Sequence, residues 1–211
     1  MINEEGRLVS TREPRPSRAP RFVIIRSTTD VAWALRDDIP APIAQQIRTL
    51  AEEEDPIRDF ATEPTNAAAY QALIRGTTEH GPVFVFPDRL PQVNDVFPVR
   101  DVAQLEHNFD GWTADEIPGC SPILAVLEGN EAVSVCFCAR KSSTAAEAGV
   151  ATAQSHRGRG LAQRVTAAWA QAIRESGCRP LYSTSWSNAA SLAVVRKLAL
   201  EPCANDWSLY G

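Results

Sequence analysis

The stretch Arg157-Gly158-Arg159-Gly160 stands directly before a helical pattern and limits what this part of the chain can form. Apolar residues recur behind it with the period of a helix, at Leu161, Val165, Ala168, Trp169, Ala172 and Ile173. The helix must therefore begin close to Gly160. The first amides of a helix have no internal partners and lie at the positive end of its dipole, and glycine lets the backbone approach a ligand closely. With two arginines beside it, this turn predicts a phosphate-binding site.

Three familiar glycine-rich motifs do not fit this turn. A dinucleotide-binding fingerprint requires a third glycine and an early place in a β-α-β unit, and a P-loop requires Lys-Ser/Thr where Leu161-Ala162 stands. An RNA-binding RGG segment would be repeated and lie outside folded elements, whereas this one is single. A purely structural turn also explains the glycines and stays open as an alternative.

The segments around the turn predict a mixed sheet. Apolar runs within 121–140 meet at Glu128-Gly129-Asn130, a hairpin signal, and 146–152 predict a third strand. After the helix, the order strand, helix, strand is predicted over 180–186, 188–200 and 206–210. An antiparallel meander that continues into this ending predicts an α+β fold, with a mixed, mostly antiparallel central sheet flanked by helices.

The first half of the chain predicts an N-terminal helical extension. Helices are expected from Pro42 up to Pro56 and from Asn66 to Gly76, a strand at 81–87, and a short helix from Asp101. Residues 1–20 hold four arginines, three prolines and little apolar surface, and so predict a disordered tail. We therefore expect a tail at 1–20, a helix and strand region at 21–120, and a core at 121–211.

Composition excludes some classes of function. The net charge of −5 argues against a surface built for nucleic acid, whose phosphates require summed positive charge. Five cysteines without CxxC spacing, and an opening stretch without a charged and apolar leader, predict reduced thiols in a cytoplasmic protein. No apolar run approaches the roughly 18 residues of a membrane span.

The glycine turn also carries a family resemblance. Arg157-x-x-Gly160-x-Ala162 resembles the pyrophosphate-binding signature Gln/Arg-x-x-Gly-x-Gly/Ala of the GCN5-related N-acetyltransferase (GNAT) superfamily. A second segment is similar to the family's Asn-x-x-Ser/Ala…Lys-Leu-Gly-Phe, with matches at Asn188, Ser191, Lys197 and Leu198, although Ala199-Leu200 replace Gly-Phe. From residue 121 to 211 the chain looks most like a bacterial GNAT branch of uncharacterised substrate.

The resemblance implies an N-acetyltransferase that moves an acetyl group from acetyl-CoA to a primary amine by direct attack, without a metal. In the family, the pantetheine arm pairs with a strand backbone, which implies contacts here at Val150 and Thr152. The resemblance also implies that the pyrophosphate is bound by Arg157, Gly158, Arg159, Gly160, Leu161 and Ala162. Asn188 and Ser191 of the later motif are the remaining implied cofactor-binding residues.

Glu147 is the candidate general base, since it lies on the strand expected beside the thioester carbonyl. A partly solvated strand glutamate is the alternative, and Tyr182, Ser183 and Ser185 could instead relay the proton. Val195 stands where many family members place the tyrosine that protonates the leaving thiolate. This departure supports a competing hypothesis, a non-catalytic acyl-CoA-binding or regulatory module.

The remaining polar candidates are expected to be structural. His107 and His156 are predicted to be surface histidines without carboxylate partners, and Cys136 and Cys138 to be small core residues on one side of a strand. The acceptor site is expected in the N-terminal helices and the loop from 88 to 99, and its partner is a small-molecule or peptide amine. Neither a membrane nor nucleic acid is expected as a partner, and a homodimer is compatible with these features.

Overall fold

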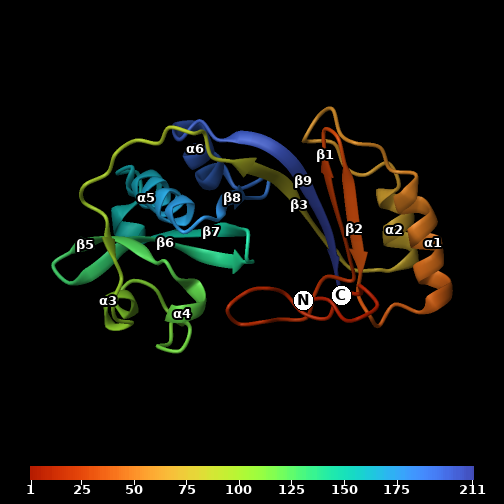
Figure 1. Ribbon diagram of the computed structural model, residues 1–211, viewed down its shortest axis with the longest axis horizontal. Helices are drawn as coiled ribbons and strands as arrows, with labels where there is room; N and C mark the ends of the chain where they lie inside the picture. The colour runs from red at the N-terminus through yellow and green to blue at the C-terminus, as the bar shows by residue number, and fades with distance from the viewer.

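A computed structural model describes residues 1–211, and it confirms the α+β class. Nine strands form one open sheet in the order β2-β1-β9-β3-β8-β7-β6-β5-β4, and every neighbouring pair is antiparallel except β7 and β8. The strands are β1 (Phe22–Ser27), β2 (Val31–Leu35), β3 (Thr77–Val85), β4 (Phe97–Pro98), β5 (Leu124–Glu128), β6 (Glu131–Lys141), β7 (Ala145–Thr152), β8 (Arg179–Ser183) and β9 (Glu201–Tyr210). The helices are α1 (Ala41–Glu52), α2 (Ala67–Leu73), α3 (Ala103–Glu106), α4 (Ile117–Cys120), α5 (Leu161–Glu175) and α6 (Ala189–Lys197), with a 3-10 turn η1 (Gln154–His156) (Figure 1).

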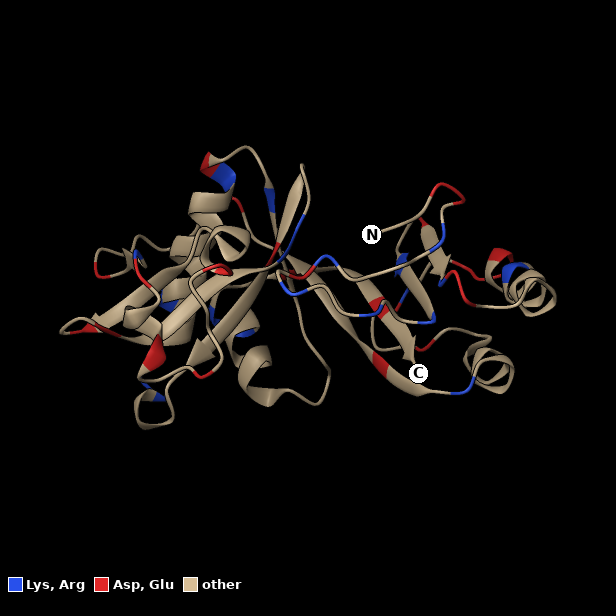
Figure 2. Cartoon of the chain, turned by 90° about the horizontal axis from the view of Figure 1, so that it is seen from below, with Lys and Arg blue, Asp and Glu red and all other residues tan.

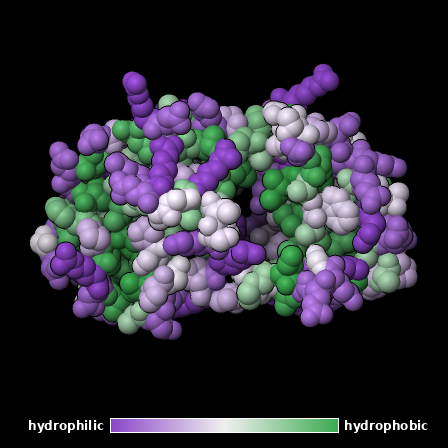
Figure 3. Space-filling model, in the orientation of Figure 1, coloured by the Kyte–Doolittle hydropathy of each residue, from purple (hydrophilic) through white to green (hydrophobic).

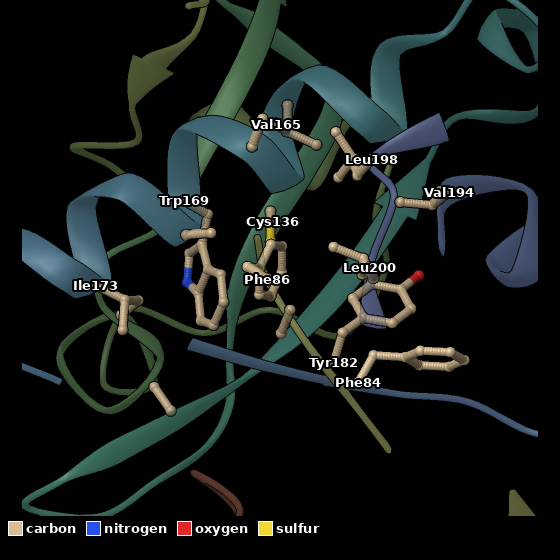
Figure 4. Packing of buried hydrophobic residues seen from close by; sticks show 14 of the residues in the cluster. Phe84, Phe86, Cys136, Val165, Trp169, Ile173, Tyr182, Val194, Leu198 and Leu200 are labelled. Carbon is tan, nitrogen blue, oxygen red and sulfur yellow. The ribbon is translucent and has the colours of Figure 1, made fainter. Parts of the chain in front are cut away.

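Helix α5 forms where the apolar stripe predicted it, and its buried face builds the largest core cluster. Trp169 and Ile173 point from α5 into this cluster, where Phe86 and Leu200 meet them from other elements (Figure 4). Each such side chain contributes about 1.5–3 kcal/mol when it is fully removed from water. The burial fixes α5 on the sheet and thereby fixes the glycine turn at its start. None of the helices has both the length and the apolar character to cross a bilayer.

Strand β9 connects the two halves of the molecule, because it lies between β1 and β3 (Figure 1). Its Trp207 packs with Phe22 and Tyr70 under α1 and α2, with ring centroids 6.3 and 5.9 Å away. The expected boundary at residue 120 therefore does not separate two bodies, since the last strand completes the sheet of the first half.

Several strand assignments differ from the sequence-based ones. Strands β1, β2 and β4 were not predicted, β3 begins at Thr77 rather than at residue 81, and β9 begins at Glu201 rather than at Asp206. Pro202, Asn205 and Asp206 lower the strand propensity of β9, but pairing with β1 on one side and β3 on the other outweighs it. Edge strand β2 is short and gives too little alternation to be recognised alone.

Residues 1–20 lie against the body of the protein, where the sequence predicts a disordered tail. The Leu8 amide donates to the Leu35 carbonyl at 2.8 Å, and Arg15 donates to Glu116 Oε2 at 2.7 Å. Glu13 forms a 3.2 Å ion pair with Arg140 of β6. The segment is held by backbone bonds and ion pairs and buries few apolar side chains, so its composition gives no sign of order.

Charges of both signs are scattered over the molecule (Figure 2).

Candidate active site

A gap opens in the sheet where β7 and β8 part. The parallel pairing runs only from Ala145↔Arg179 to Glu147↔Leu181, although β7 continues to Thr152. Residues 148–152 stay paired with β6 on their other side. Their backbone groups on the β8 side therefore have no strand partner, and an extended ligand can bond to them as an added strand.

The glycine turn lies at the end of this gap. Gly158 and Gly160 have φ of +80° and +77°, values that other residues rarely adopt, so the turn requires both glycines. Gly160 is the N-cap of α5 and has no side chain to bond the first amides. A Cβ at Gly158 would meet no atom within 4 Å, because the turn faces open space.

A cavity of about 810 Å³ joins the turn to the gap, and we call it the turn cavity. It brings together all of the predicted cofactor-binding residues except one: Val150, Thr152, Arg157, Gly158, Gly160, Leu161, Ala162, Asn188 and Ser191. Arg159 lies outside it, more than half exposed, and pairs with Glu128 at 3.4 Å. The sequence analysis missed Gln154, His156 and Lys197 of the same lining, as well as Asn108 and Phe109, which reach it from the distant α3 region.

Tyr182 brings a buried hydroxyl to the turn cavity. Its Oη lies 2.6 Å from Ser191 Oγ, and the Ser191 amide donates to Asn188 Oδ1 at 3.0 Å, which caps α6. Burial raises the pKa of Tyr182, so its phenol stays protonated at neutral pH. Figure 4 shows this hydroxyl at the edge of the core cluster. Val195, by contrast, is buried within the cluster and takes no part in the polar lining.

Glu147 occupies the last paired position before the gap. Its carboxylate accepts a hydrogen bond from Ser183 Oγ and forms a 3.2 Å ion pair with Arg140 Nη1. The side chain is 22% exposed, so these two partners hold it while one side remains accessible. Ser185 points elsewhere and bonds Ser187 at 2.8 Å. Of the polar residues considered for β8, only Ser183 thus contacts Glu147.

Glu147 also lines a second cavity of about 380 Å³, which we call the carboxylate cavity because Asp206 shares it. Its walls come from β1, β7, β8, β9 and residues 1–20. Figure 3 shows the molecular surface hollowed between the two halves. Leu181 lines this cavity while the next residue, Tyr182, lines the turn cavity, so the two cavities approach each other where β7 and β8 part.

Residues 124–210 match a family described as GNAT acetyltransferase. The second half of the chain is therefore similar to the GNAT superfamily, and solved GNAT structures share its fold. No curated protein matches the chain.

Solved GNAT structures share the fold of this chain at low sequence identity. A putative GNAT acetyltransferase from Novosphingobium aromaticivorans is 17% identical with a TM-score of 0.52; the match covers 63% of this chain and 64% of that one, a little under two thirds of its length. A GCN5-related N-acetyltransferase from Kribbella flavida is 18% identical with a TM-score of 0.51, over 97% and 90% of the chains. One from Sphaerobacter thermophilus is 11% identical with a TM-score of 0.52, over 98% and 77%.

Both histidines have a carboxylate partner, contrary to the prediction, although His107 lies at the surface as predicted. His156 Nε2 lies 3.0 Å from Glu128 Oε1 and its side chain is only 13% exposed, and His107 Nε2 lies 3.6 Å from Glu131 Oε2. Both carboxylates flank the β5–β6 turn, which the fold brings close to residues distant in sequence. Cys136 and Cys138 are core residues as predicted, and burial raises the pKa of both thiols.

Proposed function

We propose that this protein transfers an acetyl group from acetyl-CoA to a primary amine. The observation that carries the proposal is the continuity of the β7–β8 gap with a cavity that ends at the glycine turn of α5. Val150 and Thr152 would hold the pantetheine arm through their backbone. Residues 157–162 would hold the pyrophosphate with uncapped amides and Arg157. Acetyl-CoA supplies a thioester whose carbonyl carbon is open to attack.

Glu147 is the general base in this proposal. Ser183 and Arg140 fix its carboxylate at the end of the gap, where it would accept a proton from the attacking ammonium. Orienting two reactants can lower a barrier by about 7–11 kcal/mol, and a positioned base typically adds about 10²–10⁴ in rate.

Tyr182 takes the place of the tyrosine that Val195 replaces. Its protonated phenol is a buried hydroxyl in the turn cavity, and it would donate a proton to the leaving thiolate. Ser191, 2.6 Å away and partly exposed, would pass a proton from solvent back to Tyr182. Tyr182 therefore supports catalysis over the non-catalytic module that Val195 alone suggests.

A pair of substitutions at Gly160 tests the proposed cofactor site. Gly160→Asp places a negative charge where pyrophosphate must lie, whereas Gly160→Asn has nearly the same shape, tolerates positive φ and is neutral. Calorimetric titration should show that Gly160→Asp binds acetyl-CoA at least tenfold more weakly than Gly160→Asn does. This difference corresponds to about 1.4 kcal/mol of binding free energy. Equal affinities in the two folded variants would refute pyrophosphate binding at this turn.

Turnover separates the two functional hypotheses. An acetyltransferase releases CoA thiol only when an amine acceptor is present, and the amine gains the mass of one acetyl group. A non-catalytic module binds acetyl-CoA without either change. The assay therefore screens amino acids, polyamines, simple alkylamines and peptides, and it measures thiol release and product mass in the same sample.

A further inference from the structure

The carboxylate cavity lies on the sheet face opposite α1 and α2. Trp207 and Leu209 of β9 pack into the core beneath those helices, so the alternating Asp206, Ser208 and Tyr210 face the other way and line the cavity. Ile25 and Val23 of β1 are in register with Asp206 and Ser208. A carboxylate thus lies beside apolar side chains on one continuous face.

Asp206 has no cationic partner within the cavity. Its carboxylate accepts a 2.7 Å hydrogen bond from Ser208 Oγ, and no lysine, arginine or histidine nitrogen lies within 4.0 Å of it. Arg140 lines the same cavity but is paired with Glu147 and Glu13. Burial raises the pKa of Asp206 and outweighs both the hydrogen bond from Ser208 and the more distant charge of Arg140, which lower it. A cationic group on a ligand would supply the countercharge that Asp206 lacks within ion-pair distance.

Half of the residues that line the carboxylate cavity are hydrophobic, and its basic side chains, Arg12, Arg140 and Lys141, accompany the two carboxylates. Ile25 is 42% exposed although it is a large aliphatic residue in mid-strand. The other apolar lining comes from β1, β8, β7 and residues 1–20 and includes Val23, Leu181, Ala145, Ala146, Ile2, Leu8, Ala19 and Pro20. Arg12 and Lys141 add exposed positive charge to Arg140 and would repel a second cationic group.

We propose that the carboxylate cavity is the acceptor site and takes a primary monoamine with an apolar body, bound with its nitrogen between Asp206 and Glu147. This inference rests on the proposed acetyl transfer. The apolar body would cover Ile25, Val23 and Leu181, which removes their exposed surface from water. The place where β7 and β8 part would bring the amine from one face of the sheet to the thioester on the other.

The two carboxylates would divide the work on the amine. Asp206 holds the ammonium, and Glu147 removes one proton from it, which leaves a lone pair on nitrogen. That nitrogen forms the amide bond to the acetyl carbon as the carbon–sulfur bond breaks, and it then releases a second proton to solvent. The leaving thiolate takes a proton from Tyr182 and departs as the thiol. Asp206 is therefore a binding residue and Glu147 the base.

A matched set of amines tests the substrate class on the unaltered protein. Pentylamine has the apolar body, cadaverine adds a second amine to the same chain, and ethylamine lacks most of the body. The expected kcat/KM for pentylamine is at least about tenfold above either of the others, since both removal of methylenes and addition of an opposed charge cost binding. An equal or higher kcat/KM for cadaverine or for ethylamine would overturn the proposal.

Substitutions in the carboxylate cavity test whether the preference for pentylamine arises there. Asp206→Asn should raise the KM for pentylamine about tenfold with the Kd of acetyl-CoA unchanged, and Ile25→Asn should bring the pentylamine-to-ethylamine ratio close to one. Phe97→Asn is the matched control, because Phe97 is a half-exposed apolar residue on β4 outside this cavity. The proposal is wrong if Phe97→Asn and Ile25→Asn change the ratio equally, or if Asp206→Asn leaves the KM unchanged.

The outcomes also separate this inference from the proposed function. Turnover of spermidine or of an amino acid without turnover of pentylamine overturns the acceptor class and leaves acetyl transfer intact. Absence of thiol release with every amine, in a protein that binds acetyl-CoA, overturns both. If Asp206→Asn does not fold, the amine series on the parent protein and the Ile25→Asn ratio still decide the acceptor class.

Discussion

Glu54 is the residue whose change should most affect stability without touching either cavity. Its side chain is fully buried and accepts hydrogen bonds from the Thr65 amide at 2.9 Å, the Asn66 amide at 2.8 Å and the Tyr70 hydroxyl at 3.1 Å. Arg26, with a 3% exposed side chain, lies 3.7 Å away as its countercharge. Glu54 thereby fastens the segment after α1 to both α2 and β1.

Glu54→Gln keeps the shape and removes the charge. Its amide group would face a backbone N–H instead of accepting from it, and Arg26 would stay buried without a countercharge. Removal of one partner of a buried pair costs about 3–5 kcal/mol. For a chain of this length, about 2–4 °C per kcal/mol corresponds to a fall in Tm of about 6–20 °C.

Thermal unfolding followed by circular dichroism measures this change, with two comparison variants. Tyr70→Phe removes one hydrogen bond and should cost about 1 kcal/mol. Glu53→Gln makes the same chemical change at an exposed neighbour and should stay within about 0.5 kcal/mol of the parent. A Glu54→Gln protein that melts within 2 °C of Glu53→Gln, on the order of the noise in such a comparison, would refute the buried-charge argument.

Three further outcomes are expected. Burial raises the pKa of Asp206, so its ionisation opposes folding as pH rises above the unfolded value of 3.8; Asp206→Asn should therefore raise Tm at pH 7, and the gain should vanish near pH 3. A gain that is constant across this range of pH would contradict that cause. Burial also raises the pKa of Cys136 and of Cys120, the latter to about 11, so a thiol reagent at pH 8 should label the partly exposed Cys178 and leave these two unmodified until denaturant is added, as peptide mass mapping can show. Glu147→Gln should lower kcat about 10²–10⁴ while calorimetry gives an unchanged Kd for acetyl-CoA; a parental rate near neutral pH would mean that the proton leaves by another route.

The second half of the fold follows from local patterns. The α5 stripe, the hairpin at Gly129 and the glycine turn are set by residues close in sequence, and each was predicted near its observed place. These local patterns also explain why nine of the predicted cofactor-binding residues lie together in the turn cavity. Contacts between segments that are distant in sequence could not be predicted from these local patterns. Strand β1 is identified by its pairing with β9, and residues 1–20 are ordered by partners such as Glu116 and Arg140 far along the chain.

The same limit explains why the carboxylate cavity was not predicted from the sequence. Asp206 and Ile25 lie about as far apart in sequence as this chain allows, and only the β1–β9 register brings them side by side. Val195 is a different case, because its departure from the family pattern was visible in sequence, while the hydroxyl of Tyr182 in the same cavity required the structure. Patterns in sequence thus indicated the residues of the turn cavity, whereas the fold was needed to bring the residues of the carboxylate cavity together.

The central place of β9 has a consequence for how the protein is made. Strands β1 and β3 both pair with β9 and not with each other, yet β9 is the last strand to be synthesised. While the ribosome is still translating, α1 and α2 have no Trp207 or Leu209 to pack against, and the apolar faces of Phe22 and Ile24 remain in water. Until residues 201–210 emerge, β1 pairs with β2 alone and its other edge stays open and prone to association, so a chaperone that shields exposed strands would act on it during this interval.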